Sequence, residues 1–288
     1  PVTPDLSNLS EDQVYLREMG ARDVADRSAY DVVSFHAQRA AYRIGARSRV
    51  SPQRQRPGPG VRERIELTAA VFDSTDSALA GVPIRWTIEK RDWMTVRVRR
   101  IGGVFGYENV PRDSLLATGT TLSAAEPSSF LWDPPAAGSY AFTVETTDPQ
   151  GRTTRARDIV YVSGDQSAAW YREDSGWIEL KPDKAEYAPG DTARILIPAP
   201  AVPTEGLVLV LDDGIRSAAR LSGIGGSPRI GVPLPGFYPP GIIVQTILIG
   251  PTLLPQGPDG RQRLPYHGWG SASLGLKLDD WRLGVNVA

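Results

Sequence analysis

The 288-residue sequence predicts an all-β chain made of tandem antiparallel β-sandwich domains. Apolar and polar residues alternate in many short segments, which is the period of strands with one buried face. The 25 Pro and 29 Gly are scattered along the chain, as expected for many short elements joined by turns. The strand pattern also stops and begins again near the middle, and the length exceeds that of a usual single domain. Two successive sandwiches follow from these observations.

We predict the first sandwich over residues 38-164. Apolar side chains alternate at 65–71, at 82–88 and at 140–146, so each of these segments has the pattern of a strand with one face in the core. The third segment ends at Asp148-Pro149-Gln150-Gly151, a sequence typical of a type I or type II turn. Residues 159–162 then supply the partner strand of a hairpin, and strands at this spacing indicate an antiparallel sandwich.

The second sandwich is predicted over residues 165-288, connected to the first through 163–176. Asp212-Asp213-Gly214 follows an apolar run and indicates a hairpin turn. Further strands are expected where apolar residues alternate or run together: 193–197, 207–211, 242–249, 274–278 and 283–287.

Residues 1-37 are expected to be the tail of a preceding domain or an N-terminal extension. Ser10 and Gln13 could form a capping box for a helix over 13–20, but the apolar residues there fit a short strand equally well. For 28–36 the pattern favours a strand.

The Arg-rich and Pro/Gly-rich segment 48–64 predicts a loop or linker. It is either an ordinary interdomain loop or a loop accessible to trypsin-like proteases, with Arg54, Arg56, Arg62 and Arg64 as the candidate residues. The segment 251–270, which is also rich in Pro and Gly, has the same two interpretations.

The composition excludes several kinds of chemistry. The chain has no Cys, which rules out disulfides, thiolate metal sites and a Cys nucleophile. Its two histidines, His36 and His267, are far apart and belong to no metal-binding motif. The 223–228 segment has the wrong glycine spacing for a phosphate loop and predicts a flexible turn. No catalytic residue, cofactor or metal ligand is therefore predicted, and the chain is not expected to be an enzyme.

The charge pattern argues against a nucleic-acid partner. Arg97, Arg99 and Arg100 lie near Trp93, yet acidic residues interleave with the arginines and the net charge is only −1. Arginines in an alternating strand are expected on its solvated face. No apolar run approaches the 18 residues of a membrane span, so direct membrane insertion is not expected.

Several segments resemble the bacterial α2-macroglobulin family in order, spacing and turn residues. The strand-loop-strand IELKPDKAEYAPGDTARILIPAP is followed by LVLVL, by DDGIRSAARL, and later by GIIVQTILIG and GWGSASLGLKLDDWRLGVNV. Upstream, ALAGVPIRWTIEKRDW and AGSYAFTVETTDPQGRTTRARDIVYVSG resemble the preceding domain of that family. The resemblance covers about 38–288.

This resemblance implies immunoglobulin/fibronectin type III-like macroglobulin (MG) domains from a large extracytoplasmic protein. Such a protein would be periplasmic or at the cell surface, membrane-anchored through an N-terminal part outside this sequence. Family members trap proteases after cleavage of a bait region, often through a thioester that needs a Cys, and many act with a penicillin-binding protein. The implied role is a non-catalytic scaffold segment, with proteases and neighbouring MG domains as partners. Because the chain has no Cys, it does not contain the thioester.

The sequence is also compatible with a binding function. A tandem β-sandwich can also be an adhesin or a carbohydrate- or protein-binding module. That alternative predicts exposed aromatic platforms or a calcium site, whereas an MG array predicts extensive domain–domain contacts.

Overall fold

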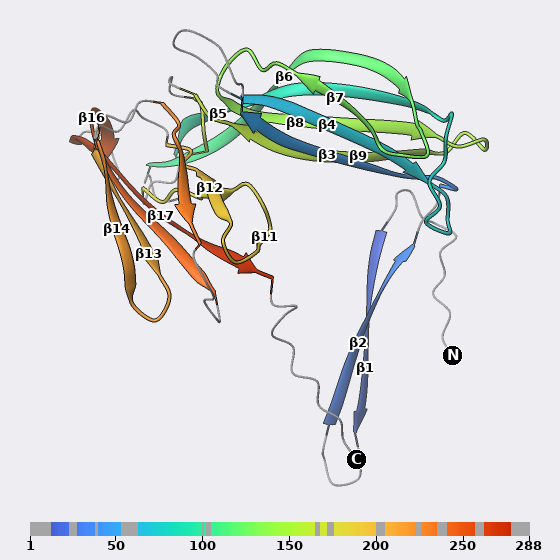
Figure 1. Cartoon of the computed structure of the whole chain (residues 1–288), viewed down its shortest axis with the longest axis horizontal. Helices are drawn as coiled ribbons and strands as arrows, with labels where there is room; N and C mark the ends of the chain where they lie inside the picture. The colour runs from blue at the N-terminus through green and yellow to red at the C-terminus, as the bar shows by residue number, and fades with distance from the viewer. Residues whose placement is uncertain are drawn as a thin grey trace.

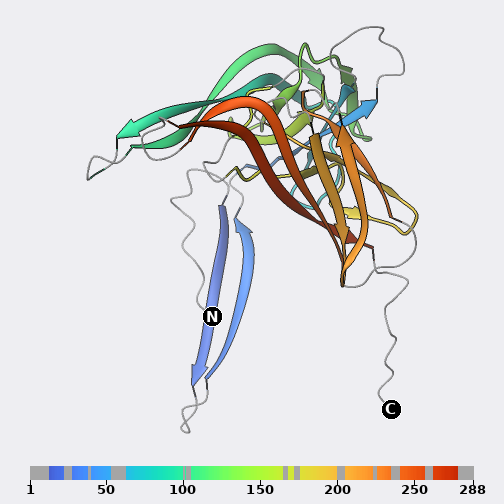
Figure 2. The same cartoon turned by 90° about the vertical axis from the view of Figure 1, so that its left-hand side faces the viewer.

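The computed structural model describes residues 13–22, 28–37, 40–52, 63–99, 101, 105–164, 168–171, 176–199, 205–222, 226–234, 241–256 and 262–277. Every named element among them is a β-strand. The strands form two sandwiches that lie side by side, with a separate hairpin projecting away from both in two perpendicular views (Figure 1, Figure 2). The predicted all-β class is confirmed.

The first sandwich consists of β3 (Arg43–Pro52), β4 (Glu63–Phe72), β5 (Pro83–Arg99), β6 (Phe105–Leu122), β7 (Ser128–Trp132), β8 (Gly138–Thr147) and β9 (Thr153–Val162). One sheet has the order β3-β4-β7 and the other β6-β5-β8-β9, and all their pairings are antiparallel. Alternating residues of β4 and β8 point between the sheets, as period-two patterning requires. The core they build is a cluster of buried side chains: Ile65, Leu67, Ala69, Val71, Val82, Ile84, Ile88, Tyr140, Phe142, Val144, Val160 and Val162.

The second sandwich consists of β10 (Lys181–Pro182), β11 (Glu186–Tyr187), β12 (Thr192–Leu196), β13 (Glu205–Leu211), β14 (Ile215–Ser222), β15 (Arg229–Pro233), β16 (Ile242–Gln256) and β17 (Gln262–Leu276). Its sheets have the orders β10-β12-β15 and β11-β17-β16-β13-β14. Tyr187, Ile195 and Ile197 are fully buried at its centre. The short β11 pairs with β17 in parallel, and the other pairings of this sandwich are antiparallel.

The N-terminal hairpin decides the alternative that the sequence left open. Residues 13–20 belong to β1 (Gln13–Arg22), which pairs along its whole length with β2 (Ser28–Ala37). The helix interpretation is therefore wrong, and the strand predicted for 28–36 is confirmed. Pairing between the two segments supplies the interstrand hydrogen bonds that neither segment could make alone.

Two predicted loops are shorter than their composition indicated. In the 48–64 segment, residues 48–52 belong to β3 and residues 63–64 begin β4. In the 251–270 segment, β16 continues to Gln256 and β17 starts at Gln262, with a register shift after Gly250. Cross-strand pairing thus overrides the local loop-forming tendency of the prolines and glycines. The strand predicted at 283–287 lies outside the described residues.

Asp148 explains the predicted β8–β9 turn. Its Oδ1 accepts hydrogen bonds from the backbone N–H groups of Gln150 and Arg152, and Gly151 takes the left-handed conformation that closes the turn. Its Oδ2 accepts from the Ala41 N–H at 2.8 Å and from the Arg152 guanidinium at 2.7 Å. Although burial raises the pKa of Asp148, these donors bring it down to about 2. The turn residue therefore also anchors the chain that enters β3.

One outer sheet face of the second sandwich is apolar. Along β16 the residues 242–250 alternate between buried and exposed, yet the exposed ones include Ile243, Ile247 and Ile249. Leu207 of β13 and Trp269 of β17 lie opposite Ile247 on the same face and are also exposed. Isoleucines on both faces are typical of a strand covered on both sides.

Candidate functional site

The two sandwiches meet through an ion pair with little access to solvent. Glu63 at the start of β4 accepts hydrogen bonds from Arg229 at the start of β15, at 2.6 Å from Nε and 3.4 Å from Nη2. The side chains are only 9% and 12% exposed, respectively. Glu63 also accepts from the Ser163 N–H at 2.7 Å, and Arg229 donates to the Tyr161 carbonyl at 2.9 Å. Both charges are thus paired and further hydrogen-bonded, which is what burial of charge requires.

A short backbone pairing lies next to this ion pair. The N–H of Ser227 donates to the carbonyl of Gly164 at 3.0 Å, and the reciprocal bond is 3.4 Å long. The fully buried Ser227 hydroxyl accepts from the Trp170 indole N–H at 2.5 Å. Trp170 and Ala168, from the connecting segment, pack with Leu196 of the second sandwich in a small apolar cluster. Charged, backbone and apolar contacts therefore all join the two sandwiches.

An aromatic cavity of about 390 Å³ opens at the same junction. It is lined by residues of the first sandwich, the connecting segment and the second sandwich: Trp93, Tyr161, Trp170, Tyr171, Trp177, Glu179, Lys181 and Pro198. The backbone N–H of Trp93 donates to the Ala169 carbonyl at 2.9 Å, so the end of the cavity near β5 is tied to the connecting segment. We define these eight residues as the junction cavity.

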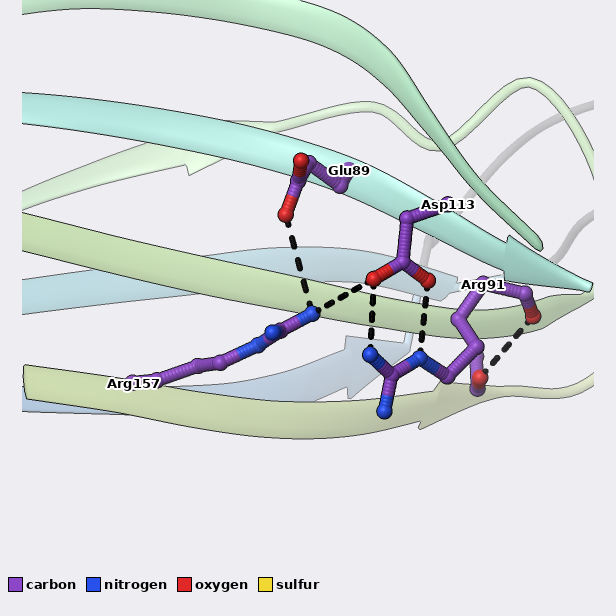
Figure 3. Close-up of polar contacts among 5 residues, drawn as sticks. Glu89, Arg91, Asp113 and Arg157 are labelled. Atoms are coloured by element: carbon purple, nitrogen blue, oxygen red, sulfur yellow. Dashed lines mark hydrogen bonds and ion pairs between the residues drawn. The ribbon is translucent and has the colours of Figure 1, made fainter. Parts of the chain in front are cut away.

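A charge cluster on the first sandwich supports the wall of the junction cavity. Arg91 and Asp113 are opposite each other on β5 and β6 and form two hydrogen bonds of 2.8 and 2.7 Å (Figure 3). Arg157 of β9 reaches Asp113 at 3.0 Å and Glu89 at 3.6 Å. The Arg91 guanidinium carbon also lies 5.9 Å from the ring centre of Trp93. Two arginines and two carboxylates balance, so this part of the surface carries no excess positive charge.

Acid is expected to weaken this cluster. The Arg91 guanidinium, assisted by Arg157, lowers the pKa of Asp113 from 3.8 to about 2. Because the folded pKa lies below the unfolded value, the stabilisation is present above about pH 4 and is lost as the pH falls towards 2. After solvent screening we expect it to be on the order of 1 kcal/mol. Urea unfolding of the natural chain and of Asp113→Asn should differ by this amount at pH 7 and converge near pH 2; a constant difference would contradict the assignment.

The predicted protease-accessible arginines are only partly within the described residues. Arg54, Arg56 and Arg62 lie outside them. Arg64 is the second residue of β4, and its guanidinium binds Asp133 at 2.6 and 3.2 Å. The candidate loop thus starts and ends on two paired strands, β3 and β4.

The junction itself was not predicted as a site from the sequence. The 223–228 segment was expected to be a flexible turn, but its Ser227 is buried and bridges the sandwiches. Glu63 and Arg229 are separated by 166 positions, and no motif links them. The sequence signal was the run of aromatic residues in and directly after the connecting segment: Trp170, Tyr171 and Trp177.

Potential metal ligands are not gathered in the part of the chain that the structure describes. No cluster of three or more His, Asp or Glu side chains able to hold a metal ion occurs there. His267 lies on the exposed face of β17, and the side chain of His36 lies outside the described set. The described residues also include no helix that could cross a membrane.

Comparison with known proteins gives one informative match. No family model matches the chain. A curated relative, the alpha-2-macroglobulin homolog of Nostoc sp., is 25% identical over 206 residues, covering 72% of this chain. The chain spans only 10% of the length of that relative.

Several of the solved structures similar to the chain carry the same family name. They include the native conformation of E. coli alpha-2-macroglobulin, at 16% identity and a TM-score of 0.43, and Salmonella alpha-2-macroglobulin reacted with methylamine, at 16% and 0.41. Each match covers 91% of this chain and 17% of the solved chain. The sequence match with the Nostoc relative confirms the resemblance to the alpha-2-macroglobulin family, and the all-β fold is consistent with a segment of macroglobulin-like domains.

Proposed function

We propose that this chain is a non-catalytic scaffold segment of a bacterial α2-macroglobulin-like protease inhibitor. The observation that carries the proposal is the junction, where Glu63, Arg229 and Ser227 join two sandwiches through contacts withdrawn from solvent. Such contacts favour movement of the two sandwiches as one body, because separating them would expose a paired charge and an apolar cluster. A scaffold needs this property to transmit a rearrangement from one end to the other.

The apolar outer face of the second sandwich gives this scaffold a place to contact its neighbours. Exposed apolar patches rimmed by polar groups mark interaction surfaces. On this face Glu205 pairs with Arg220 beside Leu207 and Ile249, so charge is neutralised at the edge of the patch. We propose that a neighbouring MG domain packs against Leu207, Ile247 and Trp269.

The remaining features of the proposal come from the family. The complete protein is periplasmic or at the cell surface and is anchored to the membrane through its N-terminal part. Its partners are the proteases that it traps and a penicillin-binding protein. Any thioester belongs to another part of the protein, because this chain has no Cys. The segment 53–62, with Arg54, Arg56 and Arg62, is a candidate for cleavage by trypsin-like enzymes.

The scaffold proposal can be tested on the full-length protein with limited proteolysis followed by small-angle scattering. We expect bait cleavage to change the scattering envelope. A disulfide introduced across the junction should not prevent this change in the envelope, because the two sandwiches move together. The segment has no Cys of its own that could form a competing disulfide. An unchanged envelope after cleavage would contradict the proposal.

The cleavage candidate can be tested separately by brief trypsin treatment of the chain and mass spectrometry of the fragments. We expect the first cuts after Arg54 or Arg62, because trypsin does not cut the bond between Arg56 and Pro57. We expect the variant with Arg54, Arg56 and Arg62 replaced by Gln to survive longer. Arg91, which is held by Asp113, is the internal reference and should be cut late. First cuts at Arg91, or equal lifetimes of the two chains, would rule out the segment as the accessible loop.

A further inference from the structure

The junction cavity is lined mainly by aromatic rings, together with the charged side chains of Glu179 and Lys181. Trp93 and Tyr171 pack edge to face, with ring centres 5.2 Å apart and planes at 87°. The ring centres of Tyr161 and Trp170 lie 6.1 Å apart and their planes are inclined at 42°, so these two rings are not stacked face to face. Tyr171 is 51% exposed although it comes from the connecting segment between two cores. An aromatic ring left half in solvent beside a cavity offers a surface on which a flat apolar face can pack.

The charges of the junction cavity are already balanced. Lys181 Nζ lies 2.6 Å from a Glu179 carboxylate oxygen and 4.8 Å from the ring centre of Tyr161. Lys181 therefore occupies the position that a cationic ligand would take over this ring. An anionic ligand would meet Glu179, whose side chain is 73% exposed. The lining thus disfavours a second charge of either sign and favours a neutral ligand.

A purely apolar ligand also fits poorly. It would cover Glu179 and Lys181 without replacing the water that solvates them, and burying charged groups without hydrogen bonds is unfavourable. A ligand with an apolar face and hydroxyl groups at its edge satisfies both parts of the lining. The cavity volume, about 390 Å³, is at the small end of the range of about 300–1,000 Å³ for small-molecule sites.

We propose that the junction cavity binds a neutral carbohydrate, with one sugar ring packed against Tyr171 and Trp93 and its hydroxyl groups bonded to Glu179 and Lys181. The ligand would contact residues of both sandwiches and of the connecting segment, so binding also stabilises their arrangement. This inference does not depend on the protease-trapping role, since a scaffold segment and a module of another protein could both carry such a site.

The test is calorimetric titration of the whole chain with three neutral trisaccharides: cellotriose, maltotriose and tri-N-acetylchitotriose. We expect saturable binding of at least one of them below about 10 mM, an affinity typical of a small exposed site. Tyr171→Ala should weaken this binding at least about tenfold by removing the ring face, whereas Tyr171→Phe should retain it. Leu131→Ala, which removes another exposed side chain outside the cavity, should leave the affinity unchanged.

Three results would overturn the proposal. The first is no saturable binding of any of the three sugars. The second is binding that survives Tyr171→Ala while circular dichroism shows the variant to be folded, because the sugar would then bind elsewhere. The third is that a charged sugar, such as chitosan trimer at pH 5, binds more tightly than its neutral N-acetylated counterpart. The balanced Glu179–Lys181 pair would then not make the cavity prefer neutral ligands.

Discussion

Replacing Glu63 by alanine is expected to destabilise the joined sandwiches by about 3 kcal/mol, at the lower end of the range for breaking a buried ion pair. The variant leaves the Arg229 guanidinium at the junction without its carboxylate and removes the acceptor of the Ser163 N–H. The Tyr161 carbonyl still accepts from Arg229, which is why the expected loss is not larger. Urea unfolding monitored by tryptophan fluorescence measures the change in free energy.

The neighbouring Arg64 supplies a matched control for Glu63. It lies next to Glu63 on β4 and forms an ion pair with Asp133, but the two side chains are 37% and 53% exposed. Solvent-exposed pairs contribute only about 0–1 kcal/mol, so Arg64→Ala should be nearly neutral. The double variant Glu63→Leu/Arg229→Met should recover much of the lost stability, because it leaves no unpaired charge. Equal destabilisation by Glu63→Ala and Arg64→Ala would show that the junction pair is not isolated from solvent.

Gly270→Ala is expected to destabilise the second sandwich by about 3 kcal/mol through overpacking. Gly268 and Gly270 lie at buried positions of β17, where the segment that contains Ile178 runs beside the strand and forms a parallel bridge with it. A Cβ at position 270 would overlap the Ile178 carbonyl oxygen, and this backbone is fixed by the hydrogen bond from the Ile178 N–H to Trp269. The backbone cannot move as a flexible side chain could, so the clash persists. Thermal unfolding by circular dichroism would show the loss.

Gly214→Ala is the control for the glycine prediction. Gly214 lies in the turn between β13 and β14, and a Cβ there would meet no atom within 4 Å. Its effect should be within about 0.5 kcal/mol of zero, as for other surface substitutions. A wild-type melting temperature for Gly270→Ala would mean that the 176–180 segment can shift away from β17.

The strands with strict alternation could be predicted because their information is local. Ile65 and Leu67 fall on one face of β4 by the geometry of any strand, and both are buried. The Asp148 turn was also local, since its carboxylate bonds the backbone two and four residues later. The helix alternative over 13–20 could not be decided in this way, because its outcome depends on pairing with residues 28–37.

The candidate site was the least predictable part of the molecule. Ser227 sits in a glycine-rich stretch whose composition indicates flexibility, but burial against Trp170 restrains it. The exposed isoleucines of β16 were part of an apolar run, and such a run does not reveal which of its faces the core uses. The sequence contains no periodic pattern that tells which acidic residue an arginine pairs with. From the sequence alone, Arg229 could have paired with any of the carboxylates.

By itself, the sequence determined the all-β class, two successive blocks of strands, the turn at Asp148 and the absence of cysteine chemistry. It did so because alternation, turn chemistry and composition are properties of neighbouring residues. Only the tertiary structure decided the sheet orders, the close approach of Ile178 to β17, the Glu63–Arg229 pair and the junction cavity. These features depend on contacts between residues up to 166 positions apart, which form only when distant strands pair and the two sandwiches pack together.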